Sequence, residues 1–212
     1  MLSESYRKMQ PEDFQAQYSV SRESFEKLKV YHALLLKWQN AINLISPKTI
    51  QESWQRHFAD SAQLAQYIPD TVKNIADLGS GAGFPGLVPA IMHPDLDVHL
   101  IESDEKKAQF LRTVSRETQV YVEVHNARIE EIEGLNPDLI TARALSDLST
   151  LLRYCEIWSA GNANLKMLFL KGQAYQDEIA GARQYFTFDV EEHASQTAAE
   201  SRILFISGLK PV

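Results

Sequence analysis

The sequence predicts an α/β protein, with a doubly wound and mainly parallel sheet preceded by an N-terminal helical extension. Three observations lead to this fold class. A glycine-rich stretch, Asp77–Gly86, lies between a short apolar run and residues of helical spacing, as in the first strand–turn–helix unit of such sheets. Strand-like and helix-like segments then alternate to the end of the chain. Before residue 71 the apolar residues show only helical periodicity.

The chain divides near residue 70 into two predicted parts, residues 1–70 and residues 71–212. The first is a helical region that packs on the second. We expect its first 20 residues to form a loose arm or a short helix. A helix should begin after Ser21, a favoured capping residue, and a second one after Ser46, because proline follows this cap. The second helix is expected to run to Pro69.

Alternating segments define the second part. Strands are predicted at 74–79, 97–102, 120–125, 138–142, 165–171 and 202–208, with a further or ragged one at 185–191. Helices are predicted at 84–92, 104–118, 147–160 and 174–184. Strands separated by helices imply a parallel sheet covered on both faces. A short connection joins the last two strand segments, which suits an antiparallel pair that closes the sheet.

Composition and charge limit the classes of function. The net charge is −7, and the acidic excess lies in residues 71–212, which hold 21 − 8 = 13 basic and 28 − 8 = 20 acidic side chains. Any nucleic-acid contact must therefore come from a local basic patch. Cys155 is the single cysteine, so we expect no disulfides and a reducing cytoplasm. The first residues lack the apolar core of a signal peptide, and no run reaches membrane-spanning length.

The glycine turn fits two kinds of ligand. Gly81-x-Gly83-x-x-Gly86 matches the dinucleotide fingerprint, and Glu102 follows Gly81 by 102 − 81 = 21 residues, where an acid that binds a ribose is expected. On this interpretation the protein is an NAD-linked oxidoreductase. The same glycines also fit a cofactor without a pyrophosphate.

S-adenosylmethionine is the cofactor that we favour. Asp77-x-Gly79-x-Gly81-x-Gly83 is the methyltransferase form of the motif, with the same Glu102 on the ribose. Pro85, if it opens the following helix, removes an N–H group that a pyrophosphate would use. An acid at position 77 also suits the ammonium group of the methionine better than a pyrophosphate.

Polar residues follow five of the predicted strands and outline a cleft at one edge of the sheet. Its cofactor side is acidic and its rim is basic. The residues include Glu102, Arg128, Arg143 and Lys171. No catalytic triad is apparent. We expect no metal site: His57 and Asp60, three apart on a helix, are interpreted as a structural pair, and the scattered histidines 93, 99, 125 and 193 receive no role.

Several motifs together resemble the RsmG family, also called GidB, of bacterial 16S ribosomal RNA guanine-N7 methyltransferases. They span nearly the whole chain: Trp38–Leu44, Arg56–Ser61, Asp77–Gly86, Leu100–Ser103 with Lys106-Lys107, Phe110-Leu111, Arg128–Glu131, Arg143-Ala144 and Lys171-Gly172. One departure is Ile45-Ser46, where the family usually has threonine after Asn-Leu. We expect this difference to affect the packing or capping of a helix and not the chemistry.

The resemblance implies a Rossmann-like class I methyltransferase domain over residues 71–212 and a role for each matched residue. The cofactor-binding residues would be Asp77, Gly79, Gly81, Gly83, Phe84, Glu102, Ile129, Glu130 and Arg143. Arg143 would lie where cofactor and RNA meet and position the reactants. The RNA-binding candidates are Arg128, Lys171 and Arg202.

The resemblance also implies the reaction, transfer of a methyl group from S-adenosylmethionine to N7 of a guanine in 16S ribosomal RNA or the small subunit. We expect a cytoplasmic monomer without a membrane partner. Three alternatives remain from the residues: an NAD-linked oxidoreductase, a non-catalytic RNA-binding or ribosome-assembly protein, and a methyltransferase acting on a protein or small molecule.

Overall fold

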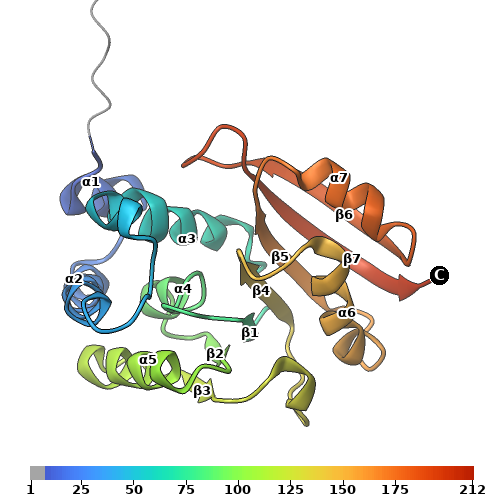
Figure 1. Ribbon diagram of the computed structural model, residues 1–212, viewed down its shortest axis with the longest axis horizontal. Helices are drawn as coiled ribbons and strands as arrows, with labels where there is room; N and C mark the ends of the chain where they lie inside the picture. Colours follow the sequence, from blue (N-terminus) through green and yellow to red (C-terminus); the bar gives the residue numbers. More distant parts are fainter. Residues whose placement is uncertain (1–7) are drawn as a thin grey trace, which may run out of the picture.

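The centre of the molecule is a seven-stranded sheet, seen in a computed structural model that describes residues 8–212 (Figure 1). The strand order is β3-β2-β1-β4-β5-β7-β6. The strands are β1 (Asn74–Leu78), β2 (Asp97–Ile101), β3 (Glu123–His125), β4 (Leu139–Arg143), β5 (Lys166–Lys171), β6 (Phe186–Ala194) and β7 (Arg202–Pro211). Strands β1 to β5 are parallel, whereas β7 runs antiparallel to both β5 and β6. The predicted mainly parallel sheet and its closing antiparallel pair are confirmed.

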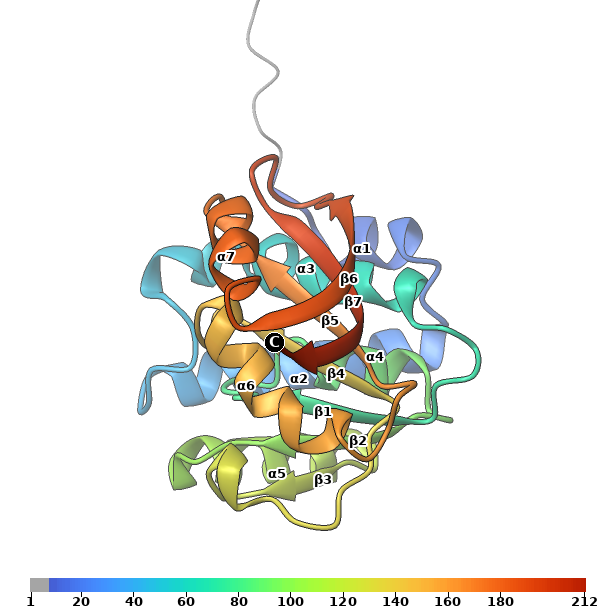
Figure 2. The ribbon, with the colours of Figure 1, turned by 90° about the vertical axis from the view of Figure 1, so that its right-hand side faces the viewer.

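Helices cover both faces of this sheet, as the prediction required (Figures 1 and 2). They are α4 (Leu87–Met92), α5 (Glu105–Thr118), α6 (Leu148–Ser159) and α7 (Tyr175–Ala182). One hydrophobic cluster joins Leu100 of β2 to Leu111 of α5, and the other joins Phe169 of β5 to Leu152 of α6. Side chains of Asp104 and Asp147 cap α5 and α6 by accepting a backbone N–H of the first turn.

Several predicted boundaries differ from the structure by up to three residues, and two of these differences have local causes. Strand β3 begins at Glu123 instead of residue 120, because the backbone N–H of Val120 and its carbonyl both bond to Ser115 at the end of α5. Helix α4 begins at Leu87 instead of residue 84. Pro85 therefore does not open the helix, and the next residue, Gly86, directs its N–H to the buried carboxylate of Asp77 at 3.3 Å. The proposed loss of an N–H at the helix start consequently does not discriminate between the two cofactors.

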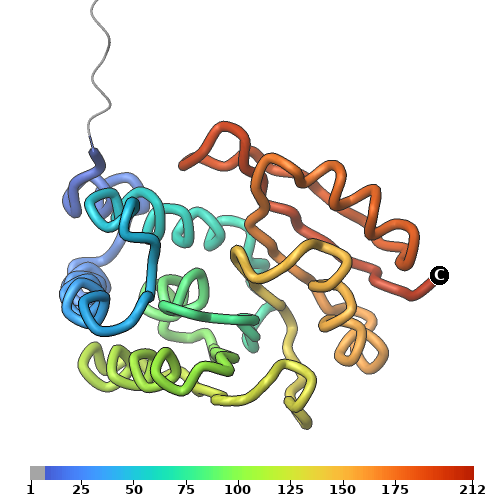
Figure 3. Tube along the Cα trace, viewed as in Figure 1, coloured from blue at the N-terminus to red at the C-terminus, as the bar shows by residue number. Residues whose placement is uncertain are grey.

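The N-terminal part contains α1 (Pro11–Gln17) and α2 (Arg22–Gln39), the latter capped by Ser21 as predicted. The portion of the expected arm at residues 1–7 lies outside the described residues. The second predicted helix runs without a gap over residues 47–67, but its regular α-helical hydrogen-bond pattern is broken. It is divided into a 3-10 helix η1 (Pro47–Glu52), a π-helix η2 (Trp54–Ala59), α3 (Asp60–Ala62) and a 3-10 helix η3 (Gln63–Tyr67), which can be followed along the trace in Figure 3.

Side chains explain this break in part. The carbonyl of Arg56 accepts a hydrogen bond from Arg143, and the carbonyl of His57 accepts one from the Ser61 hydroxyl. Carbonyls that bond to side chains are drawn away from regular helical geometry. Arg143 lies 87 positions away in sequence, so local periodicity could not indicate the break.

The N-terminal helices share a core with the sheet domain. Tyr31 of α2 and Phe58 of η2 are fully buried in one hydrophobic cluster with Phe84 of the glycine turn and Phe110 of α5. The ring of Tyr31 stacks on that of Phe84 with centroids 5.3 Å apart. The predicted packing of the two parts is thus present, whereas their division at residue 70 stays a prediction. Among the described residues, every helix is too short or too polar to cross a bilayer.

Candidate active site

The glycine turn follows β1 and faces the carboxyl ends of the parallel strands. Gly81 and Gly83 have φ values of +56° and +92°, a region that side chains strongly disfavour. A Cβ on Gly83 would also collide with Leu87 and lie 2.8 Å from the Tyr31 hydroxyl. That hydroxyl donates a short hydrogen bond to the carbonyl of Ala82. The turn is therefore fixed from behind by α2, whereas a Cβ on Gly81 would meet only the carbonyl of Gly79, at 3.7 Å.

Asp77 supports the turn from beneath. It is fully buried, and its carboxylate accepts hydrogen bonds from the Thr141 hydroxyl at 2.8 Å and from the N–H of Gly86 at 3.3 Å. Burial raises the pKa of Asp77 to about 6, although these hydrogen bonds act in the opposite direction. The side chain does not line the cavity in front of the turn.

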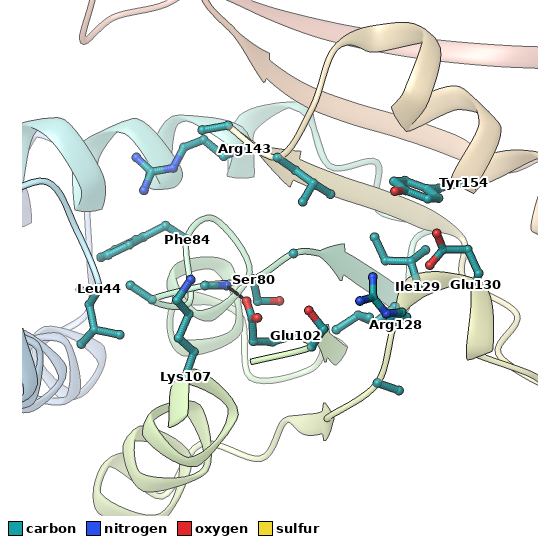
Figure 4. Close-up of a pocket in the computed structure, with 18 residues that line it drawn as sticks. Leu44, Ser80, Phe84, Glu102, Lys107, Arg128, Ile129, Glu130, Arg143 and Tyr154 are labelled. Atoms are coloured by element: carbon teal, nitrogen blue, oxygen red, sulfur yellow. Dashed lines mark hydrogen bonds between the residues drawn. The ribbon is translucent and has the colours of Figure 1, made fainter. Parts of the chain in front are cut away.

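A cavity of about 450 Å³ opens in front of the turn (Figure 4). Arg143 and Phe84 lie at one end of it, and Glu130 and Tyr154 at the other. Predicted cofactor residues that line it are Gly79, Gly81, Phe84, Glu102, Ile129, Glu130 and Arg143. Predicted residues from four separate segments thus meet at one cavity. Sequence reasoning assigned no role to Leu44, Lys107 or Tyr154, which also line it.

Glu102, at the end of β2, connects two walls of this cavity. One carboxylate oxygen accepts a hydrogen bond from the N–H of Gly81 at 2.8 Å, and the other accepts one from the N–H of Asp104 at 2.7 Å. The residue is only 7% exposed, yet it lines the cavity. Each carboxylate oxygen has a second lone pair, so the group can hold the loop and still accept hydrogen bonds from a ligand.

Arg143, at the end of β4, joins the sheet to the N-terminal helices. Its guanidinium donates to the carbonyl of Arg56 at 3.0 Å, to Asp60 Oδ2 at 3.3 Å and to His57 Nδ1 at 2.9 Å. It also lies over the Phe84 ring, 5.1 Å from the centroid. His57 and Asp60 thus share Arg143 as a partner, a relation that their spacing of three residues did not indicate.

A second cavity, of about 600 Å³, lies beside the first and shares Arg143, Ala144 and Leu145 with it. Lys171 lines this cavity but is only 7% exposed, because its Nζ lies 2.5 Å from Glu178 Oε2 and donates to the carbonyl of Ser146 at 2.7 Å. The two cavities therefore meet at the end of β4. A methyl donor in one and an acceptor in the other would meet at Arg143.

Comparison with known sequences assigns the family. The model of the family described as rRNA small subunit methyltransferase G matches residues 24–204. The ribosomal RNA small subunit methyltransferase G of Rhodospirillum centenum is 46% identical over 199 residues, which cover 94% of this chain and 91% of the relative. The chain belongs to the rRNA small subunit methyltransferase G family. The resemblance to RsmG is therefore confirmed.

Solved structures agree with the fold of this family member. Mitomycin 7-O-methyltransferase MmcR matches with a TM-score of 0.58 at 12% identity, covering 93% of this chain and 72% of that chain. A mutant of MtNAS in complex with S-adenosylmethionine matches with a TM-score of 0.56 at 13% identity, covering 96% and 85%. At such identities the likeness concerns the fold, and it confirms the predicted Rossmann-like class I architecture.

Four predicted site residues of this rRNA small subunit methyltransferase G member have surroundings that the sequence did not indicate. Gly83 packs on α2 and does not line the first cavity. Asp77 does not line that cavity either. Arg128, predicted for RNA, is exposed and lines the cofactor-side cavity. Arg202 lines neither of the two cavities; its guanidinium donates to the carbonyls of Ala199 and Ser201. The RNA contacts of these arginines stay predictions.

His57 should make the stability of the protein depend on pH. Burial, and then the nearby Arg143 and Arg56, lower its pKa to about 3. Between about pH 6.5 and 3 the unfolded chain therefore binds a proton that the folded protein does not. As the pH decreases through this window, the free energy of unfolding should therefore fall by up to about 1.4 kcal/mol per pH unit on account of this residue.

His57→Asn retains an acceptor near Nδ1 but cannot titrate. Its free energy of unfolding should therefore fall less steeply than that of the wild type between about pH 6.5 and 4, by a slope of about one proton. Urea unfolding at several pH values measures both slopes. Asp77 titrates in both proteins, so it cancels from the comparison. His93→Asn, at an exposed position after α4, is the control. Parallel wild-type and His57→Asn profiles would contradict this prediction.

Proposed function

We propose that the protein transfers the methyl group of S-adenosylmethionine to N7 of a guanine in 16S ribosomal RNA of the small ribosomal subunit. The family supports ribosomal RNA methylation as the activity. The observation that carries the assignment to this chain is the pair of adjoining cavities, which share Arg143, Ala144 and Leu145. One cavity contains the glycine turn and the other extends toward Lys171.

The residues of the first cavity fit S-adenosylmethionine. Glu102 can accept hydrogen bonds from the ribose hydroxyls while it holds the N–H groups of Gly81 and Asp104. Gly81 lines the cavity without a side chain, so its backbone can approach the cofactor closely. Ile129 and Glu130 are assigned to the adenine, and Gly79 to Phe84 to the methionine end. Asp77 is assigned to the support of the turn, since its carboxylate is buried behind it.

The second cavity is assigned to the target guanine. When bound, the cofactor supplies an electrophilic methyl group on a sulfonium. Guanine N7 has an in-plane lone pair and no proton, so the chain needs no general base. Its task is to align the two reactants and exclude water. Arg143 positions them, because it is fixed by three hydrogen bonds at the junction of the cavities. Bases become accessible in loops or when turned out of a helix.

Methyl transfer to small ribosomal subunits tests this proposal. Labelled S-adenosylmethionine is incubated with the protein and under-methylated subunits, and the labelled nucleoside is identified after digestion. We expect label in 7-methylguanosine of the small-subunit RNA. Binding of NAD instead of S-adenosylmethionine would support an oxidoreductase. Tight RNA binding without transfer would support a non-catalytic assembly protein, and label in a protein or small molecule would support another substrate.

Arg128 and Lys171 should affect RNA binding in different ways. Arg128 is exposed at the first cavity, so its contact with a phosphate would release a counterion. Arg128→Ala should weaken binding of the small subunit and reduce the slope of log affinity against log salt by roughly one unit or less. Lys171 is already paired with Glu178. Lys171→Met should therefore leave the slope unchanged. It should reduce the rate of methyl transfer, because Lys171 lines the cavity assigned to the guanine.

The measurement is the affinity for small subunits at several salt concentrations for both variants. Lys106→Ala, which also removes a cation from the same end of the molecule but does not line either cavity, is the control. S-adenosylmethionine affinity should change little in Arg128→Ala. An unchanged slope for Arg128→Ala would remove it from the RNA surface. A reduced slope for Lys171→Met would mean that the ion pair opens when RNA binds.

We also propose that the protein acts as a cytoplasmic monomer. Both cavities are lined by residues of a single chain, so neither requires a second copy. A cytoplasmic location agrees with a ribosomal substrate and with the single cysteine, Cys155, which is buried as a free thiol.

A further inference from the structure

Two histidines and a glutamate meet at the outer edge of the sheet, where β2 pairs with β3 (Figure 2). His99 is opposite Glu123 in the parallel register, and His125 is two positions further along β3. Leu100 and Val124 pack into the hydrophobic cluster that contains α5. Because side chains alternate along a strand, His99, Glu123 and His125 lie on the opposite face. None of the three lines either cavity of the active site.

The three side chains form a small triangle, in which each carboxylate oxygen of Glu123 faces a different histidine. His99 Nδ1 lies 3.0 Å from His125 Nε2 and 3.4 Å from Glu123 Oε2, and His125 Nε2 lies 3.8 Å from Glu123 Oε1. Zinc binds nitrogen and oxygen at about 2.0–2.2 Å in a tetrahedron, whose edges are then roughly 3.3–3.6 Å long. The three distances are within a few tenths of an ångström of such edges, and one ligand atom from each residue lies within 4.8 Å of the other two. A single ion could therefore contact all three residues after a rotation of the Glu123 carboxylate.

We propose that His99, Glu123 and His125 bind one Zn²⁺ ion and that water completes the tetrahedron. Two imidazoles and a carboxylate are a donor set that suits zinc. The side chains of His99 and His125 are 12% and 22% exposed, and that of Glu123 is 52% exposed. The histidines thus form an enclosed base, and the glutamate lies on the side from which an ion and its water can enter.

Asp97 adds an independent indication. Its Oδ2 lies 3.8 Å from Nε2 of His99, the ring nitrogen that does not face the triangle. Carboxylates near the second nitrogen of a histidine ligand commonly fix its orientation and tautomer in zinc sites. The arrangement therefore includes the ligands and a carboxylate beside one of them, which would have to move closer to form the hydrogen bond that orients the ring.

The ion would stabilise the edge of the sheet next to the cofactor cavity. β3 has only three residues and pairs with β2 alone among the described strands. The residue after it, Asn126, donates hydrogen bonds to the carbonyls of Glu102 and Ser103. A metal that joins β2 to β3 would hold this connection in place. Its role is structural, and it does not depend on the function proposed above.

Zinc binding by the purified protein tests the site. Untagged, chelator-treated full-length protein is titrated with ZnCl₂ in a calorimeter and, separately, with CoCl₂, whose tetrahedral complexes absorb strongly in the visible range. We expect one Zn²⁺ per chain, a higher unfolding temperature with zinc, and a tetrahedral cobalt spectrum. Asp97→Asn should weaken zinc binding by about 10–100-fold, and His99→Ala and His125→Ala by more.

Two further variants keep the result interpretable. Glu123→Gln changes a half-exposed side chain, so it should fold normally and still lose zinc affinity. His193→Ala is the matched control: His193 lies 3.7 Å from Glu191, but in the part of the chain that the structure describes it belongs to no group of three ligands. Absence of stoichiometric zinc binding, or equal binding by wild type and Glu123→Gln, would overturn the proposal. The two imidazoles would then be joined by a hydrogen bond alone.

Discussion

Glu102→Ala should reduce the affinity for S-adenosylmethionine by at least about tenfold. Charge-assisted hydrogen bonds from the ribose hydroxyls to a largely buried carboxylate contribute roughly 1.5–3 kcal/mol. The structure adds a second cause, because the same carboxylate holds the N–H groups of Gly81 and Asp104. Its removal would both delete the ribose contact and release the glycine turn. Calorimetric titration of the folded variant with the cofactor measures the effect.

Two controls separate these causes. Glu105→Ala removes an exposed acid three residues further on, so its affinity should equal that of the wild type. Glu102→Gln preserves the shape of the side chain, but its amide NH₂ would face one of the two backbone N–H groups and cannot accept from it. Its affinity for the cofactor should therefore lie between those of Glu102→Ala and the wild type. If Glu102→Ala binds the cofactor as tightly as the wild type, the ribose does not lie against this residue.

Arg143→Ala should destabilise the protein by about 2–4 kcal/mol and also lower the affinity for both reactants. The variant leaves Asp60, a side chain only 17% exposed, without its cationic partner, and leaves His57 Nδ1 and the Arg56 carbonyl without a donor. The stacking contact with Phe84 is lost as well. Urea unfolding measures the stability, and titrations with cofactor and with small subunits measure the two affinities.

Arg153→Ala is the matched control for this change. Arg153 also lies over an aromatic ring, that of Tyr185 at 4.9 Å, but it is exposed on α6. Arg153→Ala should therefore lower the free energy of unfolding by about 0.5–1 kcal/mol or less. Arg143→Lys keeps the charge without the planar fork and should recover only part of the stability. If Arg143→Ala loses stability but keeps both affinities, Arg143 supports the fold and does not position the reactants.

The sheet domain could be predicted almost completely from sequence because its signals are local. Alternating apolar runs marked the strands, and the short link between the last two strand segments indicated their antiparallel pairing. The N-terminal part was predicted less well. Its second helix loses the α-helical hydrogen-bond pattern where Arg143 and Ser61 bond to backbone carbonyls, and in the case of Arg143 the cause lies in a distant strand.

Site residues at the ends of parallel strands were predicted from the sequence. Contacts that depend on how one element docks on or pairs with another were not. Glu102 and Arg143 end parallel strands, so topology alone brought them together. The shared partner of His57 and Asp60 depends on how η2 docks on β4. Likewise, His99 and His125 appeared scattered because 26 positions separate them, and only the pairing of β2 with β3 places them in contact.

The contact of Tyr31 with the glycine turn has a consequence for the divergence of related sequences. The Tyr31 hydroxyl donates a hydrogen bond to the carbonyl of Ala82, and the hydroxyl oxygen lies 2.8 Å from the position of a Cβ on Gly83. Neither position can change freely while the other is retained. A larger residue at 83 would require smaller ones at both 31 and 87, and phenylalanine at 31 would leave the buried carbonyl without its donor. The helical extension and the cofactor turn should therefore be inherited together, and a chimera that exchanges the extension between distant relatives must exchange the turn with it.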